Sequence, residues 1–432
     1  MSIYDNAGVV LIPSGYKAGT TDNLYSVLPA NGDGDFNATR GSSATRVNKD
    51  GFIESVATNV PRLDYPLIDG VVQDCPALLL EPQRTNIQGY SESFSNWSRS
   101  NVGATENQSV SPDGNLTADF VNEYSGVNNK FIYLNESVTS GNDYTYSVFA
   151  KSNGTRYIQL TGSTGLDTGH VNFDLQTGTI TLESAVLGSS IEKYPNDWYR
   201  ISVTLSCTLT TSAGRCLIAL INSGTSGRVQ NYDGDTSKGV YLWGAQFEIS
   251  DYPTSYIQNL SSGTTTRSAD VCNGSGTSAE FDSQSGALFA EFKTVLSGGN
   301  FLISIADGTS NTGAVFVGAD ANEKIYSYYN SANHTSDIDS FEHFNKIVNT
   351  WDSSGVKIYI NGFSRTISGS QSLSSSDYDN LRFSRANGSL PFYGDVKQVM
   401  TFKTKLTDSE LETLTSWDSF NAMAKGQLYT IE

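Results

Sequence analysis

The sequence predicts an all-β protein built from several domains. Glycine, serine, threonine and asparagine are abundant, aromatic residues make up 11% of the chain and charged residues only 17%, which is typical of short strands joined by many turns. From residue 91 onward, strand-length segments follow one another at short intervals and are separated by turn sequences. A chain of 432 residues has room for about two to four domains.

Residues 1–43 are expected to form a polar, glycine-rich segment with one short strand, VVLIP. The run NGDGD at residues 31–35 has the residue types of a calcium loop, but the full spacing that ends in a bidentate glutamate is absent. A solvated turn is therefore the preferred interpretation, with calcium as the alternative.

Residues 44–86 are the stretch around which we expect the chain to be organised. They contain two predicted strands, FIESVA and GVVQ, and the apolar run ALLL. Four prolines hold the path extended and irregular, and apolar residues alternate with charged ones between Val60 and Asp69. This pattern is typical of a chain that lies across another surface, so we interpret it as a docking collar within an anchor region, residues 1–90.

Residues 91–258 contain at least seven strand-length segments, among them SVFAKS, RYIQLTG, RCLIALIN and GVYLWGAQFEI. Turn sequences such as TSGND, QTG and YPND separate them, and this spacing predicts a jelly-roll sandwich. Residues 259–279 are dense in Ser, Thr and Gly and lack apolar periodicity, which predicts a linker.

Residues 280–432 form the last predicted β-domain. The segment NKIVNTWDSSGVKIYINGFS indicates a hairpin followed by a turn at Asn361-Gly362. Further on, Thr407 and Glu410 have the spacing of a capping box, and the leucines around them are spaced to face a sheet. We therefore expect a short helix against this sheet.

Several strings closely resemble a family of phage and prophage head-spike and tail-fibre proteins. In chain order they are ATRVNKDGFIESVATNVPRLDY, CPALLLEPQRTN, YSESFSNW, GVYLWGAQFE, YPTSYI and TRSADVC. The resemblance implies a virion surface protein, made in the host cytoplasm, whose N-terminal part attaches to a capsid vertex (penton) or tail protein. It also implies a homotrimer. The residues expected to make the virion attachment are Pro61, Arg62, Leu63, Tyr65, Glu81, Arg84 and Asn86.

Two further resemblances concern single domains. The strand that begins with Trp198-Tyr199-Arg200, followed by GVYLWGAQFE, is similar to carbohydrate-binding jelly rolls, some of which bind glycans while others only scaffold. The hairpin and capping box within residues 280–418 resemble laminin-G and concanavalin-A-like sandwiches. The implied architecture is an extended N-terminal anchor, a jelly-roll β-sandwich and a concanavalin-A-like β-sandwich, and removal of residues 1–90 is expected to leave both sandwiches folded.

The formal net charge of −18 argues against nucleic acid and anionic membranes as partners, because a polyanion binder needs a positive field. No basic start followed by a long apolar core marks a targeting peptide, and no apolar run is long enough to span a bilayer. We therefore expect cytoplasmic synthesis without secretion and no membrane insertion.

The four cysteines, Cys75, Cys207, Cys216 and Cys272, form no CxxC pattern or His/Cys cluster, so no zinc site is expected. Cys207 and Cys216 flank a predicted hairpin, and a disulfide across it is one alternative. Free buried thiols are the favoured state, since they are usual in cytoplasmically made proteins.

Patterns for catalysis are weak. Of the three histidines, His170 stands alone, and the run SDIDSFEHF between His334 and His343 has no spacing that places ligands on one face. Glycoside hydrolases of the retaining type need two carboxylates about 5 Å apart, and the E-x-D-x-x-E strand that carries them in concanavalin-like enzymes is missing. We expect no catalytic residue, no cofactor and no metal, with calcium at Asp307 and Asp320 as an alternative.

Glycan sites combine aromatic rings with asparagine, aspartate and glutamine side chains. The predicted glycan-binding residues are loop tyrosines, for each of which an ordinary exposed tyrosine is the simpler interpretation: Tyr232, Tyr328, Tyr329 and Tyr378. Trp198, Trp243 and Trp351 lie in predicted strands and are expected in the core.

The sequence thus predicts a phage spike or fibre protein that attaches to host cells, with a surface glycan as its expected ligand. Two other classes stay open. One is a structural capsid decoration protein with no receptor role, and the other is a polysaccharide depolymerase.

Overall fold

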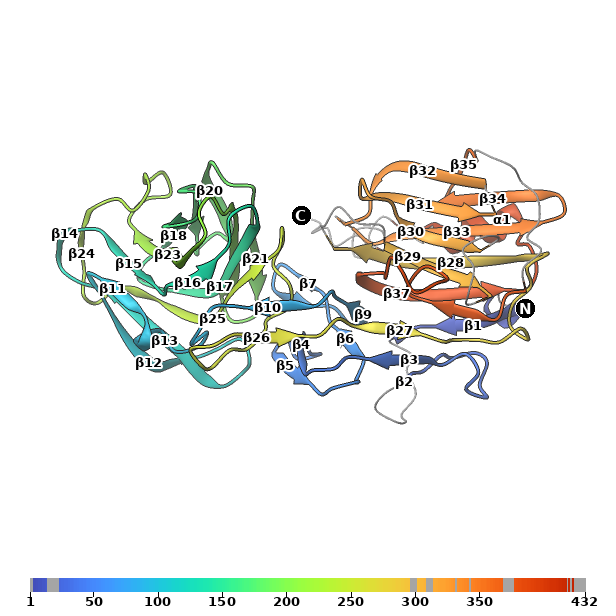
Figure 1. Ribbon diagram of the computed structural model, residues 1–432, viewed down its shortest axis with the longest axis horizontal. Coiled ribbons are helices and arrows are strands. Elements are labelled where there is room, and N and C mark those ends of the chain that lie inside the picture. The colour runs from blue at the N-terminus through green and yellow to red at the C-terminus, as the bar shows by residue number, and fades with distance from the viewer. Residues whose placement is uncertain are drawn as a thin grey trace.

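The computed structural model describes residues 3–13, 23–295, 301–307, 314–330, 332–341, 343–367 and 377–417, together with residues 419 and 422. The protein is elongated, with a β-sandwich at each end and the N-terminal region between and along them (Figure 1). Strands dominate the described residues, so the predicted all-β fold is confirmed.

The middle sandwich consists of two antiparallel sheets. The first contains, in spatial order, β11 (Ser98–Ser100), β15 (Lys130–Tyr133), β23 (Thr211–Ile221), β18 (Tyr157–Ser163), β19 (His170–Asp174) and β20 (Thr179–Ser184), with β16 (Glu136–Val138) also paired to β23. The second contains β12 (Val102–Val110), β13 (Leu116–Glu123), β25 (Gly239–Ile249), β17 (Asp143–Asn153), β22 (Trp198–Ser206) and β21 (Gly188–Tyr194). The 3-10 helix η3 (Phe94–Asn96) and the pair β14 (Gly126–Asn128) and β24 (Tyr232–Gly234) complete this unit.

The period of two along β17 explains how this sandwich is built. Tyr144, Tyr146, Val148 and Ala150 alternate along the strand, and all four are buried in the core between the two sheets. Phe149 points to the opposite face, where it belongs to a separate apolar cluster. Strands β11 to β25 all fall within residues 91–258, the range predicted for the jelly roll.

The second sandwich also has two antiparallel sheets with a core between them. Its eight-stranded sheet runs in the order β35 (Phe363–Arg365), β34 (Gly355–Ile360), β33 (Asn345–Asp352), β28 (Gly286–Thr294), β37 (Gly394–Phe402), β9 (Ala77–Leu80) and β6 (Arg62–Asp64), with β1 (Ala7–Leu11) paired to β37. Its five-stranded sheet runs in the order β32 (Ala332–Asp339), β31 (Lys324–Tyr329), β30 (Val315–Ala319), β29 (Phe301–Ala306) and β36 (Asn380–Arg382).

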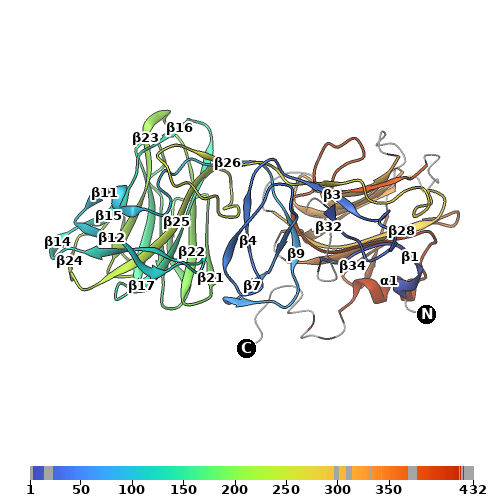
Figure 2. The ribbon, with the colours of Figure 1, turned by 90° about the horizontal axis from the view of Figure 1, so that it is seen from below.

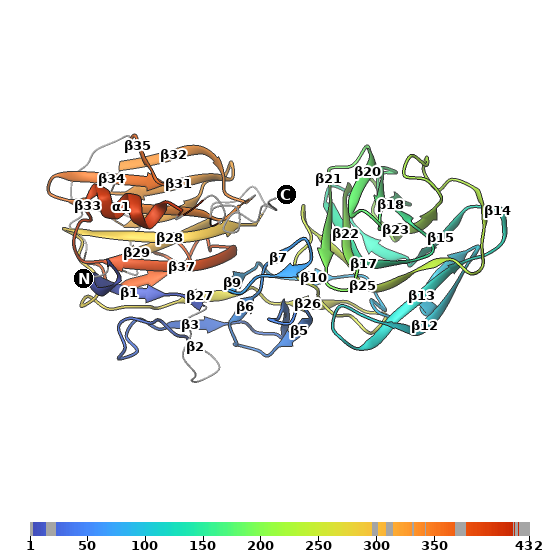
Figure 3. The same ribbon diagram turned by 180° about the vertical axis from the view of Figure 1, so that it is seen from behind.

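The predicted hairpin and helix of this sandwich are confirmed. Strands β33 and β34 form the hairpin, with Ile347 opposite Ile360 at one end and Asp352 opposite Gly355 at the other. Asn361 (φ 50°) and Gly362 (φ 87°) then make the left-handed turn into β35. Helix α1 (Asp408–Thr415) begins with a complete capping box between Thr407 and Glu410. It lies on the outer face of the eight-stranded sheet (Figure 3), where its leucines join an apolar cluster with strands β28, β33 and β37.

The N-terminal region is not a separate anchor, because three of its strands belong to the eight-stranded sheet. Strand β1 pairs with Val399 to Phe402 of β37, and β9 pairs with Gly394 to Val396 of the same strand. Together they cover one edge of β37 almost end to end, and an uncovered edge would expose unpaired backbone groups. Leu11, Leu78 and Leu80 fill the core between the two sheets.

The rest of the N-terminal region forms short sheets around the junction. The pairs are β4 (Ala44–Val47) with β5 (Ile53–Val56) and β7 (Leu67–Ile68) with β8 (Val71–Val72), and a 3-10 helix, η1 (Ile3–Asn6), precedes β1. Seen from below, β4, β7 and β9 lie between the two sandwiches (Figure 2). Val47 and Ile53 of the β4–β5 hairpin pack against Phe149, Trp198 and Trp243 on the outer face of the jelly roll.

The predicted linker is also structured, so the boundaries at 259–279 and 280 need correction. Strand β26 (Thr265–Arg267) pairs with β10 (Arg84–Asn86), and β27 (Val271–Asn273) joins β3 (Phe36–Thr39) and β2 (Asn23–Leu24) in a three-stranded sheet. The second sandwich therefore combines residues from both ends of the chain. Strand pairing between segments so distant leaves no periodic signal in either of them.

Three tryptophans and the cysteines behave as expected from their sequence context. Trp198, Trp243 and Trp351 are each 1% exposed, which confirms the core assignment. Cys207 and Cys216 are both buried free thiols, so the structure has the favoured of the two predicted states.

The expectation that both sandwiches survive removal of residues 1–90 conflicts with this topology. We predict that a chain consisting of residues 91–432 keeps a folded jelly roll but loses the second sandwich. The deletion removes four buried leucines of its core, Leu11, Leu24, Leu78 and Leu80, each worth about 2–5 kcal/mol, from a domain whose whole stability is about 5–15 kcal/mol.

Hydrogen exchange of the truncated and full-length chains measures this directly. Loss of amide protection in β28, β33 and β37, with protection retained in β17 and β22, is the expected result. Full protection of β28 and β37 in the truncated chain would show that the N-terminal strands are dispensable.

Candidate functional site

A buried charged cluster holds the three parts of the protein together. Arg62 donates from Nη1 to Oε2 of Glu81 (2.7 Å) and from Nη2 to the Asp270 carboxylate. Arg267 donates to the same Glu81 oxygen at 2.6 Å, and Arg40 donates to Oδ1 of Asp270 at 3.0 Å. These five residues, Arg40, Arg62, Glu81, Arg267 and Asp270, are named the junction cluster.

Hydrogen bonds to neighbouring backbone and hydroxyl groups complete the junction cluster. Ser255 donates from its amide and its hydroxyl to the two oxygens of Glu81, at 2.8 and 2.6 Å. Arg62 also donates to the carbonyl of Thr45, and Arg267 to the carbonyl of Pro82. Buried ionic groups need such additional partners, because their mutual attraction alone does not offset the loss of hydration.

Two charges of the junction cluster, those of Glu81 and Arg62, are stabilised by their partners. Burial alone would raise the pKa of Glu81, but Arg267, Arg62 and the Ser255 hydrogen bonds outweigh it and hold the pKa well below its ordinary value. Burial alone would lower the pKa of Arg62, whereas Asp270 and Glu81 raise it above its ordinary value. Both side chains therefore stay ionised inside the protein.

The predicted virion-attachment residues lie in and around this junction. Arg62, Glu81 and Asn86 are buried, with 0%, 4% and 0% exposure. Asn86 donates to the carbonyls of Ala245 and Ile257 and accepts from the amide of Phe247. Because these three side chains are buried against their own chain, the prediction that they contact another protein is wrong.

The other four predicted attachment residues are half-buried and also face inward contacts. Leu63 packs against the core of the second sandwich and Tyr65 against the β4–β5 cluster. The Arg84 guanidinium lies 5.9 Å from the ring centre of Tyr252, and Pro61 directly precedes Arg62. The segment thus lies across another surface, as its pattern predicts, but that surface belongs to the same chain and not to another protein.

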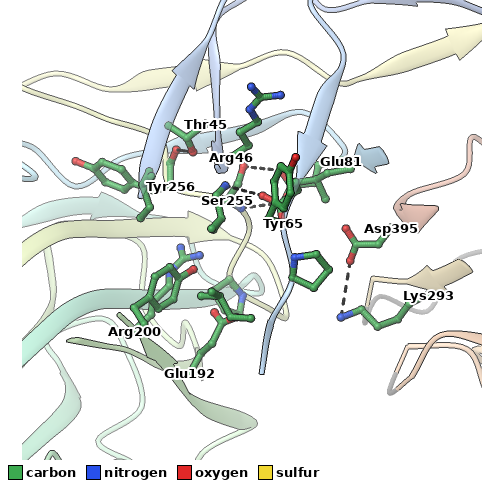
Figure 4. Close-up of a pocket in the computed structure, with 18 of the residues that line it drawn as sticks. Thr45, Arg46, Tyr65, Glu81, Glu192, Arg200, Ser255, Tyr256, Lys293 and Asp395 are labelled. Atoms are coloured by element: carbon green, nitrogen blue, oxygen red, sulfur yellow. Dashed lines mark hydrogen bonds and ion pairs between the residues drawn. The ribbon is translucent and has the colours of Figure 1, made fainter. Parts of the chain in front are cut away.

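A cavity of about 230 Å³ lies where the N-terminal region meets both sandwiches. Figure 4 shows Glu192 and Arg200 of the jelly roll on one side, and Lys293 and Asp395 of the second sandwich on the other. Asp64 of β6 also lines the cavity and accepts a 2.7 Å hydrogen bond from the amide of Val47. Three carboxylates from three parts of the chain therefore line one cavity, which is open to solvent on the side of Glu192, an exposed residue.

Burial disfavours the charged form of each of these carboxylates. Burial, together with the charge of Asp395, raises the pKa of Asp64 to about 7. Burial also raises the pKa of Asp395, although Lys293 opposes it from a distance of 3.7 Å. The pKa of Glu192 is raised by burial and lowered in part by Arg200 and Lys293. Of the three, Asp64 therefore has a pKa close to neutral pH.

The predicted glycan-binding tyrosines are not loop residues exposed to solvent. Tyr232, Tyr329 and Tyr378 are 7%, 0% and 2% exposed, and Tyr329 stacks on Trp351 with ring centres 5.2 Å apart. Tyr378 meets the same indole edge-on. Tyr328 is half-buried on the outer face of β31, beside Phe316. The three buried tyrosines are neither glycan-binding loop residues nor ordinary exposed tyrosines, because their rings are packed inside the protein. Both predictions for them were wrong.

Other predicted candidates are separate from one another. His334 lies in β32 of the second sandwich, where its Nδ1 is hydrogen bonded to the Thr366 carbonyl at 2.7 Å. His170 lies in β19 of the jelly roll, where burial lowers its pKa. Asp320 accepts from the amides of Asn322 and Lys324 in a turn. In the part of the chain that the structure describes, no three acidic, histidine or cysteine side chains are placed to hold a metal ion.

Sequence reasoning missed Arg40, Arg267 and Asp270, which complete the junction cluster. Two of them, Arg267 and Asp270, lie in the string TRSADVC, where the serine- and threonine-rich surroundings predicted an exposed linker. No local signal was available, because in β6 and β26 the arginine is the single buried position of a short strand. Among the described helices, none is long and apolar enough to cross a membrane.

Comparison with known families identifies the second sandwich. Residues 277–412 match the family model of the concanavalin A-like lectin/glucanases superfamily, so this sandwich is a concanavalin A-like domain, as the sequence predicted. The sequence matched none of the curated proteins compared with it.

Solved structures similar to this chain include sialidases and their carbohydrate-binding modules. A carbohydrate-binding module of the Ruminococcus gnavus IT-sialidase, bound to α2,3-sialyllactose, is 16% identical, with 31% of this chain and 83% of that chain covered and a TM-score of 0.26. The Trypanosoma rangeli sialidase in complex with sialic acid is 10% identical, with 92% and 78% covered and a TM-score of 0.27. At such low TM-scores these matches do not extend the assignment beyond residues 277–412.

We predict that Glu81→Gln destabilises the protein by about 3–5 kcal/mol, because it leaves Arg62 and Arg267 buried without their shared carboxylate. The matched control is Glu54→Gln. Glu54 pairs with Arg46 at a partly exposed site, where an ion pair is worth about 0–1 kcal/mol. Urea unfolding of both variants measures the difference, and equal losses would contradict the assigned role of the junction cluster.

The Asp64 carboxyl predicts a pH dependence of stability. Its pKa is about 7 in the folded protein and about 3.9 when unfolded, so between these values the folded state keeps a proton that the unfolded state has lost. This contribution to stability is full below pH about 4, falls as the pH rises and is gone above pH about 7.

Asp64→Asn should remove this fall. Urea unfolding at pH 4.5, 6.0 and 7.5 is expected to show the stability of the native chain dropping relative to that of the variant as the pH rises. The control, Asp235→Asn, removes an exposed acid whose pKa is lowered, mainly by hydrogen bonds from Ser237. This acid is ionised in both states across the range, so its removal should give almost no pH-dependent difference. A pH-independent difference for Asp64→Asn would refute the assignment.

Proposed function

We propose that this chain is a surface protein of a bacteriophage particle and that it attaches the particle to host cells by recognising a surface glycan. The match of residues 277–412 to the concanavalin A-like lectin/glucanases superfamily is the observation that carries glycan recognition. The place on a virion rests on the resemblance to phage head-spike and tail-fibre proteins.

Four of the strings that carry the resemblance to phage proteins lie together in the folded chain. This supports the interpretation that the resemblance reflects a shared arrangement of domains. Arg62 comes from the first string, Glu81 from CPALLLEPQRTN, Ser255 from YPTSYI, and Arg267 and Asp270 from TRSADVC. A chain of hydrogen bonds connects these five residues in the junction. We propose that the strings mark the joint between two sandwiches.

Attachment to a capsid vertex or tail protein is part of this proposal. Because the side chains expected to make this contact are mostly inside the junction, the contact is proposed for the exposed side of the N-terminal region, where Val71 of the β7–β8 hairpin is 64% exposed. The proposed assembly is a homotrimer, as the resemblance implies, and its mass in solution is measurable by light scattering.

Binding without cleavage is the proposed mode of action. Lectin-type recognition needs directed hydrogen bonds and aromatic contacts but no proton transfer. The acid-lined cavity of Figure 4 lies where the N-terminal region and the two sandwiches meet. We propose that its carboxylates serve the structure of this junction and not catalysis.

Binding of the labelled full-length chain to host cells tests this function. We expect saturable binding that purified host surface polysaccharide abolishes and that polysaccharide from an unrelated bacterium leaves intact. The full chain is required because its two ends share one sheet. Binding unaffected by the host polysaccharide would refute glycan recognition, and release of reducing ends from that polysaccharide would refute binding without cleavage.

A further inference from the structure

We infer that the glycan site is a second cavity, between the β4–β5 hairpin and the jelly roll, and that it accepts an uncharged saccharide. This inference rests on the proposed function, since it assigns that function a place and a ligand class. The site lies outside the concanavalin A-like domain and contains none of the predicted glycan-binding tyrosines.

The cavity has the size and access of a small-ligand site. Its volume is about 420 Å³, within the range of about 300–1,000 Å³ typical of such sites. Three of the residues that line it are exposed: Ser55 of β5, Asn115 of the turn after β12, and Gln258 of the segment that follows β25. Solvent, and hence a ligand, reaches the cavity past these residues.

Its walls carry the chemistry that a saccharide requires. Hydroxyl groups of serine and threonine, the amides of Asn115 and Gln258, and the carboxylates of Glu54 and Asp113 all line the cavity. Sugar hydroxyl groups both donate and accept hydrogen bonds, so they need such a mixed set. Trp243 and Tyr256, whose ring centres are 4.7 Å apart, also line the cavity. Because they are only 1% and 3% exposed, they form an apolar inner wall and not an open stacking surface.

Two buried donors of the cavity lining have no hydrogen-bond acceptor. Trp243 and Arg267 are each 1% exposed, and neither Nε1 of Trp243 nor Nε of Arg267 has a partner. Burial raises the pKa of Glu92, and Gln258, Tyr256 and the Trp243 indole lower it in part, so Trp243 lies near this carboxyl without forming a hydrogen bond of normal geometry. An unsatisfied buried donor is unfavourable, and an acceptor oxygen of a bound ligand would satisfy it.

Charge selects the ligand class. Arg267, a cation in the wall, is already neutralised by Glu81, with Nη1 and Oε2 2.6 Å apart. Glu54 is likewise paired with Arg46, at 2.6 Å, so Asp113 supplies the unpaired charge of the wall. Asp113 and the net charge of the chain, −18, would repel the carboxylate of a sialic or uronic acid. An uncharged saccharide meets no such repulsion.

The walls of the cavity come from elements that are held rigidly. The hydroxyl of Thr45 donates to the carbonyl of Tyr256 at 2.6 Å, which connects the β4–β5 hairpin to the segment that follows β25. Tyr256 in turn donates to Glu92 at 2.9 Å. A site formed in advance loses little entropy on binding, which suits recognition of a flexible polysaccharide.

Two substitutions in the full-length chain test this site, with purified host surface polysaccharide as the probe. Ser55→Trp places a large side chain in the cavity and should lower the affinity at least tenfold. Gln258→Ala removes an amide from the wall and should lower it about threefold to tenfold. The matched controls are Ser98→Trp, at an exposed serine in the edge strand β11, and Gln176→Ala, at an exposed glutamine in the β19–β20 turn. Both controls should bind like the native chain.

A chemically modified probe tests the ligand class. Reduction of all carboxyl groups of the polysaccharide to alcohols should leave the affinity of the native chain unchanged, and loss of binding would overturn the uncharged class. Native affinity of both cavity variants would overturn the site while leaving the proposed function intact. If Ser55→Trp does not fold, Gln258→Ala decides, since it truncates an exposed side chain. No binding by the native chain would overturn the function and the inference together.

Discussion

The shared carboxylate of Glu81 is the contact on which the arrangement of this protein depends. It accepts from Arg62 of the N-terminal region and from Arg267 beyond the jelly roll, and Ser255 donates to both of its oxygens. Asp270 repeats the motif with Arg62 and Arg40. Because these charges are buried, each is tolerated only while its partners are in place, so segments far apart in the chain must dock together.

This dependence explains why the N-terminal region is shared between the two sandwiches. Strands β1, β6 and β9 complete the eight-stranded sheet, whereas the β4–β5 hairpin covers the outer face of the jelly roll. The junction cluster lies between these two contacts. The two sandwiches are therefore joined by a structured region, in which β26 and β27 pair with strands of the N-terminal region. A cavity formed between the hairpin and the jelly roll keeps its shape for the same reason.

Much of the fold was predictable because local chemistry determines it. The period-two pattern of β17, the Asn361-Gly362 turn and the capping box at Thr407 each depend on neighbours within a few residues. The burial of Trp198, Trp243 and Trp351 followed from their positions in such strands. The tyrosines were misplaced because a polar sequence context predicted loops, whereas Tyr329 ends strand β31 and packs beneath Trp351.

By itself, the sequence determined the all-β class, the two sandwiches and the docking character of residues 44–86. Only the tertiary structure decided what those residues dock on. Val9 donates its amide to the hydroxyl of Thr401, 392 positions away, and Arg62 meets Asp270 across 208 positions. Alternation along a strand tells which side chains are buried, but it carries no information about which strand lies alongside. The partner of each strand, and with it the junction cluster and the cavities beside it, is decided by which buried surfaces and charges fit together once the whole chain is folded.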